Sequence, residues 1–141
     1  MKLIHKISKT TTLDEGVLIK RIVVKIEERK YNLISTTDIS VSFDDENSWK
    51  FNNWERAYRL DNGRFEIITG SNFNTVVFEY CPISITDYLS VIVLCGIFFA
   101  IGAINGVYSS GIISLVFITH MVIKYQVLKR KASEMLAEIL I

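Results

Sequence analysis

Hydrophobic and polar positions divide the chain into two parts with different patterns. Before residue 80, apolar residues alternate with polar ones or repeat at helical spacing, whereas residues 88–123 form a run of 36 positions without Lys, Arg, Asp or Glu. One helix crosses a hydrocarbon core of about 30 Å with about 20 apolar residues, so this run fits two helices better than one. The turn dipeptide Asn105-Gly106 interrupts the run near its middle. We therefore predict a two-helix transmembrane hairpin over residues 83–125.

The charges beside this hairpin predict its orientation. The loop between the two helices, residues 103–111, carries no charge, whereas four basic residues lie at and just after the end of the second helix: Lys124, Lys129, Arg130 and Lys131. Basic flanks stay on the cytoplasmic side of a membrane. Two crossings return the chain to the side that it left. We expect an integral membrane protein with two spans and both termini cytoplasmic, in a bacterial inner membrane.

The first 82 residues are expected to form a cytoplasmic α+β head that contains one helix. Thr12-Leu13-Asp14-Glu15 has the spacing of a helix capping box. Four apolar residues then fall on one helical face: Ile19, Ile22, Val23 and Ile26. The competing interpretation of residues 13–28 is a strand, because the segment is rich in β-branched residues. We favour the helix.

The rest of the head predicts a small antiparallel sheet. After Tyr31, apolar residues recur at every second position in several short runs, which indicates four or five strands. Asp61-Asn62-Gly63 is a turn cluster between two such runs, and it predicts a hairpin over about residues 56–68. The helix is expected to lie on this sheet and to cover its apolar face.

The last 16 residues, 126–141, predict a cytoplasmic amphipathic helix that continues the second membrane helix. Its apolar positions repeat at helical spacing: Leu128, Ala132, Met135, Leu136 and Ile139. Such a stripe needs an apolar partner, which is the sheet of the head, the same helix in another subunit or the lipid surface. We favour the head slightly, because the two ends of the hairpin lie close together.

Charge and motif content narrow the function. Residues 1–80 hold 12 Lys and Arg and 12 Asp and Glu, and this balance argues against nucleic acid as the main ligand. The chain has two histidines and no Walker-type glycine loop, CxxC pair or HExxH motif, so we expect no catalytic site, no metal site and no cofactor. Asp44-Asp45-Glu46 lacks the spacing of a calcium loop and is interpreted as a solvated turn. We predict a protein that is not an enzyme.

Aromatic and basic residues gather around the predicted hairpin of the head and form a candidate ligand-binding site. Its members are Trp54, Arg56, Tyr58, Arg59 and Arg64. Arginines beside aromatic rings suit a phosphate-bearing small ligand, through bidentate hydrogen bonds and stacking, or the anionic headgroups of lipids. The alternative interpretation is structural: the aromatic residues belong to the small sheet, and the arginines pair with glutamates nearby.

Small residues four positions apart form a candidate packing site in both predicted membrane helices. They are Gly96 and Ala100 in the first helix, and Ser110 and Ser114 in the second. Small side chains let two helix backbones approach closely. The contact is either within the hairpin or between subunits of a homo-oligomer.

These features predict a small membrane protein whose head binds a ligand or protein partner and whose hairpin oligomerises or perturbs the bilayer. A compact cytoplasmic sensing head on a short transmembrane hairpin resembles small bacterial membrane effectors of nucleotide-triggered antiphage systems, and this layout implies a role in bacterial defence. The alternative is an accessory or immunity-type subunit that is docked on a larger membrane protein. An enzyme that acts at the membrane surface is a third hypothesis.

Overall fold

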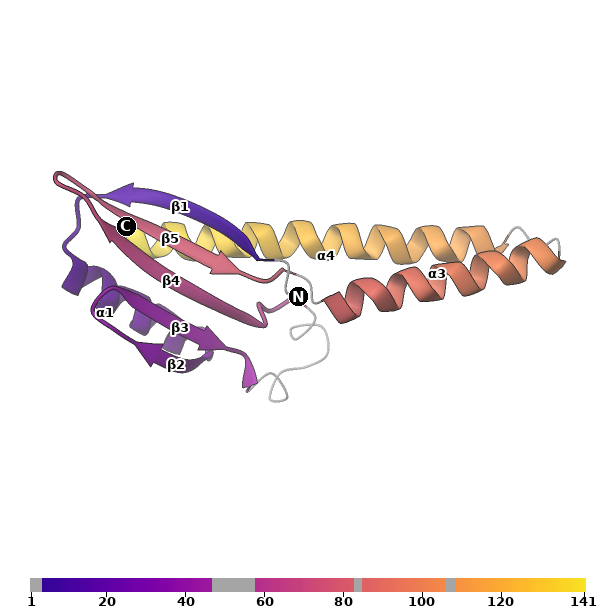
Figure 1. The fold of residues 1–141 in the computed structure, drawn as a ribbon, viewed down its shortest axis with the longest axis horizontal. Helices are drawn as coiled ribbons and strands as arrows, with labels where there is room; N and C mark the ends of the chain where they lie inside the picture. Colours follow the sequence, from indigo (N-terminus) through magenta and orange to yellow (C-terminus); the bar gives the residue numbers. More distant parts are fainter. Residues whose placement is uncertain (1–3, 47–57, 83–84, 106–108) are drawn as a thin grey trace.

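The structure, a computed structural model, describes residues 4–46, 58–82, 85–105 and 109–141. These residues form one five-stranded antiparallel sheet and three helices. In chain order the elements are β1 (His5–Thr11), α1 (Glu15–Glu28), β2 (Asn32–Thr36), β3 (Ser40–Asp44), β4 (Asn62–Thr69), β5 (Asn74–Tyr80), α3 (Ile85–Asn105) and α4 (Ser109–Leu140). Figure 1 shows a head that contains the sheet and α1, from which α3 and one half of α4 project as a narrow arm.

The sheet has the strand order β1-β5-β4-β3-β2, and all neighbouring strands are antiparallel. Strand β2, at one edge, was not predicted. Its register with β3 shifts between Leu33 and Ser35, and such an irregularity breaks the alternation of apolar and polar positions that reveals a strand. Most of its residues are also exposed, so burial adds little to the pattern.

The hairpin turn predicted at Asp61-Asn62-Gly63 is wrong. Asn62 begins β4, and Gly63 lies inside this strand, where it is paired with Phe43 of β3 and Tyr80 of β5. A Cβ atom on Gly63 would lie 2.6 Å from the ring of Phe43 and 2.7 Å from the ring of Phe78. Glycine therefore serves the close approach of two aromatic rings at this position, not a turn.

The segment after β1 forms helix α1, which confirms the prediction of a helix over a strand for residues 13–28. Asp14 is the N-cap, and its carboxylate accepts a hydrogen bond from the backbone N–H of Gly16 at 3.1 Å. The buried residues Leu18, Ile22 and Ile26 follow one another at four-residue spacing and point at the sheet. Burial of this face outweighs the modest preference of β-branched residues for strands.

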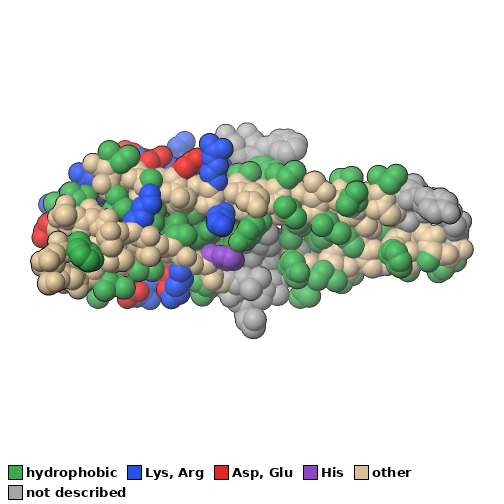
Figure 2. Space-filling model, turned by 90° about the horizontal axis from the view of Figure 1, so that it is seen from above, with side chains coloured by type: hydrophobic (Ala, Val, Ile, Leu, Met, Phe, Trp, Pro, Cys, Tyr) green, Lys and Arg blue, Asp and Glu red, His purple; other side chains and the backbone are tan. Residues whose placement is uncertain are grey.

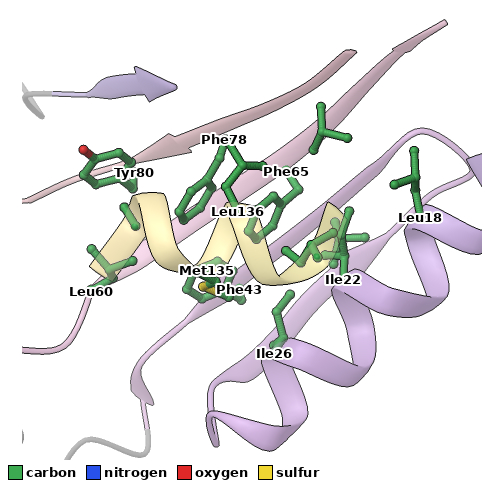
Figure 3. Close-up of a cluster of buried hydrophobic side chains, with 14 of the residues drawn as sticks. Leu18, Ile22, Ile26, Phe43, Leu60, Phe65, Phe78, Tyr80, Met135 and Leu136 are labelled. Atoms are coloured by element: carbon green, nitrogen blue, oxygen red, sulfur yellow. The ribbon is translucent and has the colours of Figure 1, made fainter. Parts of the chain in front are cut away.

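The hydrophobic core lies between the sheet and two helices that cover the same face of it. Figure 3 shows Ile22 of α1 and Met135 and Leu136 of α4 pointing towards the aromatic rings of the strands. The rings of Phe65 and Phe78 stack with centroids 4.1 Å apart. The predicted apolar stripe of the tail is confirmed, and its partner is the sheet of its own head, since all of its members are buried: Leu128, Ala132, Met135, Leu136 and Ile139.

The predicted fold class, a one-helix head followed by a two-helix transmembrane hairpin and a C-terminal amphipathic helix, is wrong, because the described residues do not contain two helices that are long and apolar enough to cross a membrane. The tail continues the second helix, as predicted, and the two form one helix, α4, which reaches from the arm into the head (Figure 1). Among the described residues, only α4 is long and apolar enough to cross a membrane, over Gly111–Leu140. The described apolar part of α3, Tyr88–Ile104, is shorter. At 1.5 Å per residue it spans about 25 Å, less than a hydrocarbon core of about 30 Å.

Candidate functional site

The predicted ligand residue Arg59 is held by the head itself. Its Nε donates to both carboxylate oxygens of Asp45 at 2.9 Å, and its Nη2 donates to Asp45 Oδ1 at 2.8 Å. The guanidinium group also donates to the carbonyl oxygens of Arg29, at 3.0 Å, and Lys30, at 3.3 Å, and lies 4.2 Å from the ring centre of Tyr31. The side chains of Arg59 and Asp45 are only 12% and 7% exposed. The interpretation of Asp45 as part of a solvated turn is therefore wrong.

The end of α1 explains how these acceptors meet the guanidinium group. Lys30 has a φ of 58°, its N–H donates to the carbonyl of Glu27 at 2.9 Å, and the N–H of Tyr31 donates to the carbonyl of Ile26 at 3.1 Å. This bond pattern is a Schellman motif, which reverses the chain after a helix. The Tyr31 hydroxyl accepts a hydrogen bond from the N–H of Leu60 at 3.2 Å, and burial raises the pKa of Tyr31. The turn thus joins α1 to the loop before β4.

The structure does not gather the predicted ligand residues around Arg59. Arg64 is exposed in β4, and its two neighbours in the strand are buried, so Arg64 lies on the sheet face opposite the helices. Tyr58 is half-buried in the loop before β4. Trp54 and Arg56 lie outside the described residues. The phosphate-binding cluster stays a prediction, and Arg59 has a clear role in joining parts of the head.

Polar contacts fasten α4 to the head beside its buried stripe. Lys131 Nζ donates to the carbonyl oxygen of Tyr58 at 2.9 Å, and Arg29 Nη2 donates to Glu138 Oε2 at 2.9 Å. Burial, followed by two nearby guanidinium charges, lowers the pKa of Lys131. The hydrogen bond from Arg29 lowers the pKa of Glu138. Because α4 also supplies core residues, it cannot move relative to the sheet without opening the core.

The arm consists of α3 and the first half of α4, which pack side by side (Figure 1). The rings of Phe98 in α3 and Phe117 in α4 stack with centroids 6.3 Å apart. The Cys95 thiol donates to the carbonyl oxygen of Ser114 at 3.8 Å. These contacts define the inner face of each helix.

Two of the predicted packing residues lie away from this inner face. Gly96 and Ala100 are exposed, and a Cβ atom on Gly96 would meet no atom within 4 Å in the part of the chain that the structure describes. Ser114 is half-buried and contacts α3 through its carbonyl oxygen. Ser110 lies in α4, but its side chain is outside the described part. A close helix contact at Gly96 and Ala100 therefore requires another molecule.

The outer surface of the arm is apolar. On the face seen in Figure 2, the Lys, Arg, Asp and Glu side chains gather on the head, and the described part of the arm carries hydrophobic and uncharged side chains. Phe99 and Ile104 of α3 are 72% and 82% exposed, and Leu115 and Val116 of α4 are also exposed. Soluble monomers rarely expose a continuous apolar patch above a few hundred Å². An exposed apolar surface of this kind indicates contact with a membrane or with another protein.

The sequence matches no protein-family model, and no curated protein is similar to it. Within the described ranges, no three His, Cys, Asp or Glu side chains form a group that could hold a metal ion. The candidate functional surface is the apolar arm, because large apolar side chains are exposed along it, together with the head to which α4 attaches it.

Proposed function

We propose that this protein is a membrane-embedded binding protein without enzymatic activity. In this proposal the apolar arm lies in a lipid bilayer, and the head lies at the membrane surface, where it binds a ligand or a protein partner. The observation that carries the proposal is the separation of charge from apolar surface along the molecule (Figure 2). Lipid suits this apolar surface, because residues 88–123 include no Lys, Arg, Asp or Glu.

The boundary between arm and head supports this assignment. The charge-free run of α4 ends at Ile123, and Lys124 and Tyr125 follow it, which are residue types favoured at membrane interfaces. On α3, Tyr88 lies at the corresponding end of the arm. The 15 residues of α4 from Ser109 to Ile123 extend about 22 Å, so the arm reaches through most of a hydrocarbon core of about 30 Å. The basic residues just beyond favour the cytoplasmic side for the head.

We propose that the head binds its partner with the open face of the sheet, which no described helix covers. On this face Lys6 of β1 pairs with Glu79 of β5, and Arg64 of β4 lies opposite Glu79 in the register. A row of alternating charges favours a partner of complementary charge pattern, because mismatched charges repel. In this proposal the polar face of the head binds the partner, and the apolar surface of the arm contacts lipid.

Flotation of the full chain with phosphatidylcholine vesicles tests the membrane proposal. The wild-type protein should float with the vesicles and remain bound in high salt, since apolar burial is not screened. The variant Phe99→Lys places a charge at an exposed position of the arm and should weaken membrane insertion, at a cost of about 3 kcal/mol on insertion scales. The control Phe73→Lys makes the same substitution at an exposed position of the head and should float normally. A wild-type chain that stays monomeric and soluble without lipid or detergent would contradict the proposal.

A second candidate function, a subunit whose arm docks on another membrane-embedded chain, is favoured by the open space at Gly96. Gly96→Leu should then disrupt the contact, whereas Gly111→Leu, also in open space, should not. The size of the complex in detergent separates the cases: loss of a homo-oligomer indicates self-association, and loss of a co-purifying protein indicates a docked subunit. A defence effector should slow cell growth when triggered, whereas a docked subunit should be harmless.

A further inference from the structure

An apolar groove runs between α3 and α4 in the half of the arm that adjoins the head. Its volume is about 480 Å³, which falls within the range of about 300–1,000 Å³ that is typical of ligand sites. Its lining is almost entirely hydrocarbon and comprises Tyr88, Val91, Ile92, Cys95, Ile118, Met121 and Val122. A groove of this lining selects an apolar ligand.

The direction of the groove suits an extended chain. The lining residues of α3 begin at Tyr88 and end at Cys95, a rise of about 10 Å along the helix axis. If the arm is embedded in lipid, the acyl chains of neighbouring lipids run parallel to it, so one chain can lie along the whole length of the groove. The phenol group of Tyr88 lies at the head end of the groove, where a tyrosine hydroxyl meets the polar layer of a membrane.

A cation lies on the same face of α4, beyond the head end of the groove. Lys129 follows Ile118 by 11 residues, which is close to three turns of 3.6 residues, so both lie on one face of the helix. Lys129 is exposed, and it is about 10 Å further along the axis than Val122. The polar layer of a bilayer is about 5 to 7 Å thick on each side. If the hydrocarbon core ends near Val122, the backbone of Lys129 lies a few Å beyond the polar layer, and the long lysine side chain can reach back to the level of the headgroups.

Lys129 is available for an anion, unlike its neighbours on α4. Arg130 pairs with Glu134 at 2.7 Å, and Lys131 donates to a backbone carbonyl of the head. The side chain of Lys129 makes no ion pair or hydrogen bond with any other residue in the described ranges. A phosphate group at the level of the lipid headgroups would complement this charge.

We propose that the groove binds one acyl chain of an anionic phospholipid and that Lys129 binds the phosphate group of that lipid. This inference rests on the proposed function, because it requires the arm to lie in lipid. The arm of a second copy is the competing occupant. Two copies packed groove to groove in one membrane would bring their Lys129 side chains to the same level, and like charges would oppose that contact.

Native mass spectrometry of the full chain in mild detergent tests the proposal, with phosphatidylglycerol and phosphatidylcholine as probes. We expect the wild-type protein to retain one phospholipid and to prefer phosphatidylglycerol by about fivefold, which corresponds to about 1 kcal/mol for one lysine near the membrane surface. Lys129→Gln should abolish this preference. Lys20→Gln, a change of an exposed lysine on α1, is the control and should keep it.

A second pair of variants tests the groove itself. Val122→Trp places a large ring in the groove and should reduce the bound fraction of both lipids several-fold. Ile123→Trp is the matched control, because Ile123 is 50% exposed where Val122 is 54% exposed, but it does not line the groove. Flotation of each variant with vesicles checks that the arm still inserts.

The possible outcomes separate this inference from the proposed function. If Val122→Trp retains lipid as the wild type does, or if Lys129→Gln keeps the preference, the inference is wrong while flotation still supports a membrane-embedded arm. If Val122→Trp instead dissociates a dimer, the groove is occupied by a second copy and the inference is again wrong. If the wild-type chain does not float at all, the proposed function itself is refuted.

Discussion

Replacing Arg59 with Ala should destabilise the head, because it removes the guanidinium group that pairs with the nearly buried carboxylate of Asp45. Asp45 is 7% exposed and accepts three hydrogen bonds from Arg59. Removal of one partner of a buried ion pair costs about 3 to 5 kcal/mol, since the remaining charge stays desolvated. Loss of the guanidinium group over the Tyr31 ring adds about 0.5 to 1 kcal/mol. We expect a loss of about 4 kcal/mol in the free energy of unfolding.

Urea unfolding of the full chain in mild detergent measures this loss. Tryptophan fluorescence and far-UV circular dichroism report the transition, and the midpoint and slope give the free energy of unfolding. A loss of about 4 kcal/mol is a large share of the 5 to 15 kcal/mol that is typical of a domain. Arg64→Ala is the control: this arginine is exposed on the open face of the sheet, so its removal should cost about 0 to 1 kcal/mol.

A double-mutant cycle with Asp45→Asn measures the interaction energy between Arg59 and Asp45. If the pair acts as a unit, the double variant should lose less stability than the sum of the two single variants. Equal unfolding midpoints for Arg59→Ala and Arg64→Ala would refute the reasoning, because the ion pair between Arg59 and Asp45 would then contribute no stability. If Arg59→Ala stays stable but loses binding of pyrophosphate, the sequence-predicted anion site regains support.

Three further predictions concern the core, the sheet and one surface carboxylate. Leu136→Ala should cost about 2 to 5 kcal/mol in urea unfolding because Leu136 is buried in the core, whereas Leu115→Ala, on the exposed arm, should leave the stability of the head unchanged. Gly63→Ala should cost about 1 to 3 kcal/mol through overpacking against two aromatic rings, and Gly111→Ala, in open space, should not destabilise in this way. The pKa of Glu138 is lowered in the folded state, so its contribution to stability is present above the unfolded pKa and is lost as the pH falls through the folded pKa. Glu138→Gln should therefore flatten the decrease in melting temperature on acidification, and an unchanged profile would contradict this assignment.

The sequence by itself determined the features that depend on neighbouring positions in the chain. A charge-free run of 36 residues predicts apolar helices, and the Asn105-Gly106 dipeptide indicates where the run is divided. Helical spacing identified the stripe from Leu128 to Ile139, and the alternating segments indicated an antiparallel sheet. These patterns report which face of an element is apolar, because side-chain direction follows the local backbone period.

Only the tertiary structure decided which partner each face and each charge has. Asp45 and Arg59 are 14 positions apart, and no local pattern links them, since the Schellman turn after α1 supplies part of their site. The role of Gly63 depends on two rings from other strands. The tertiary structure also decided how the charge-free run is divided between α3 and α4. Helix α4 continues without a break into the core of the head, and the described apolar part of α3 is shorter than a full membrane span. Pairing between distant segments depends on the packing of the whole chain, and it cannot be predicted from local periodicity, which depends only on neighbouring positions.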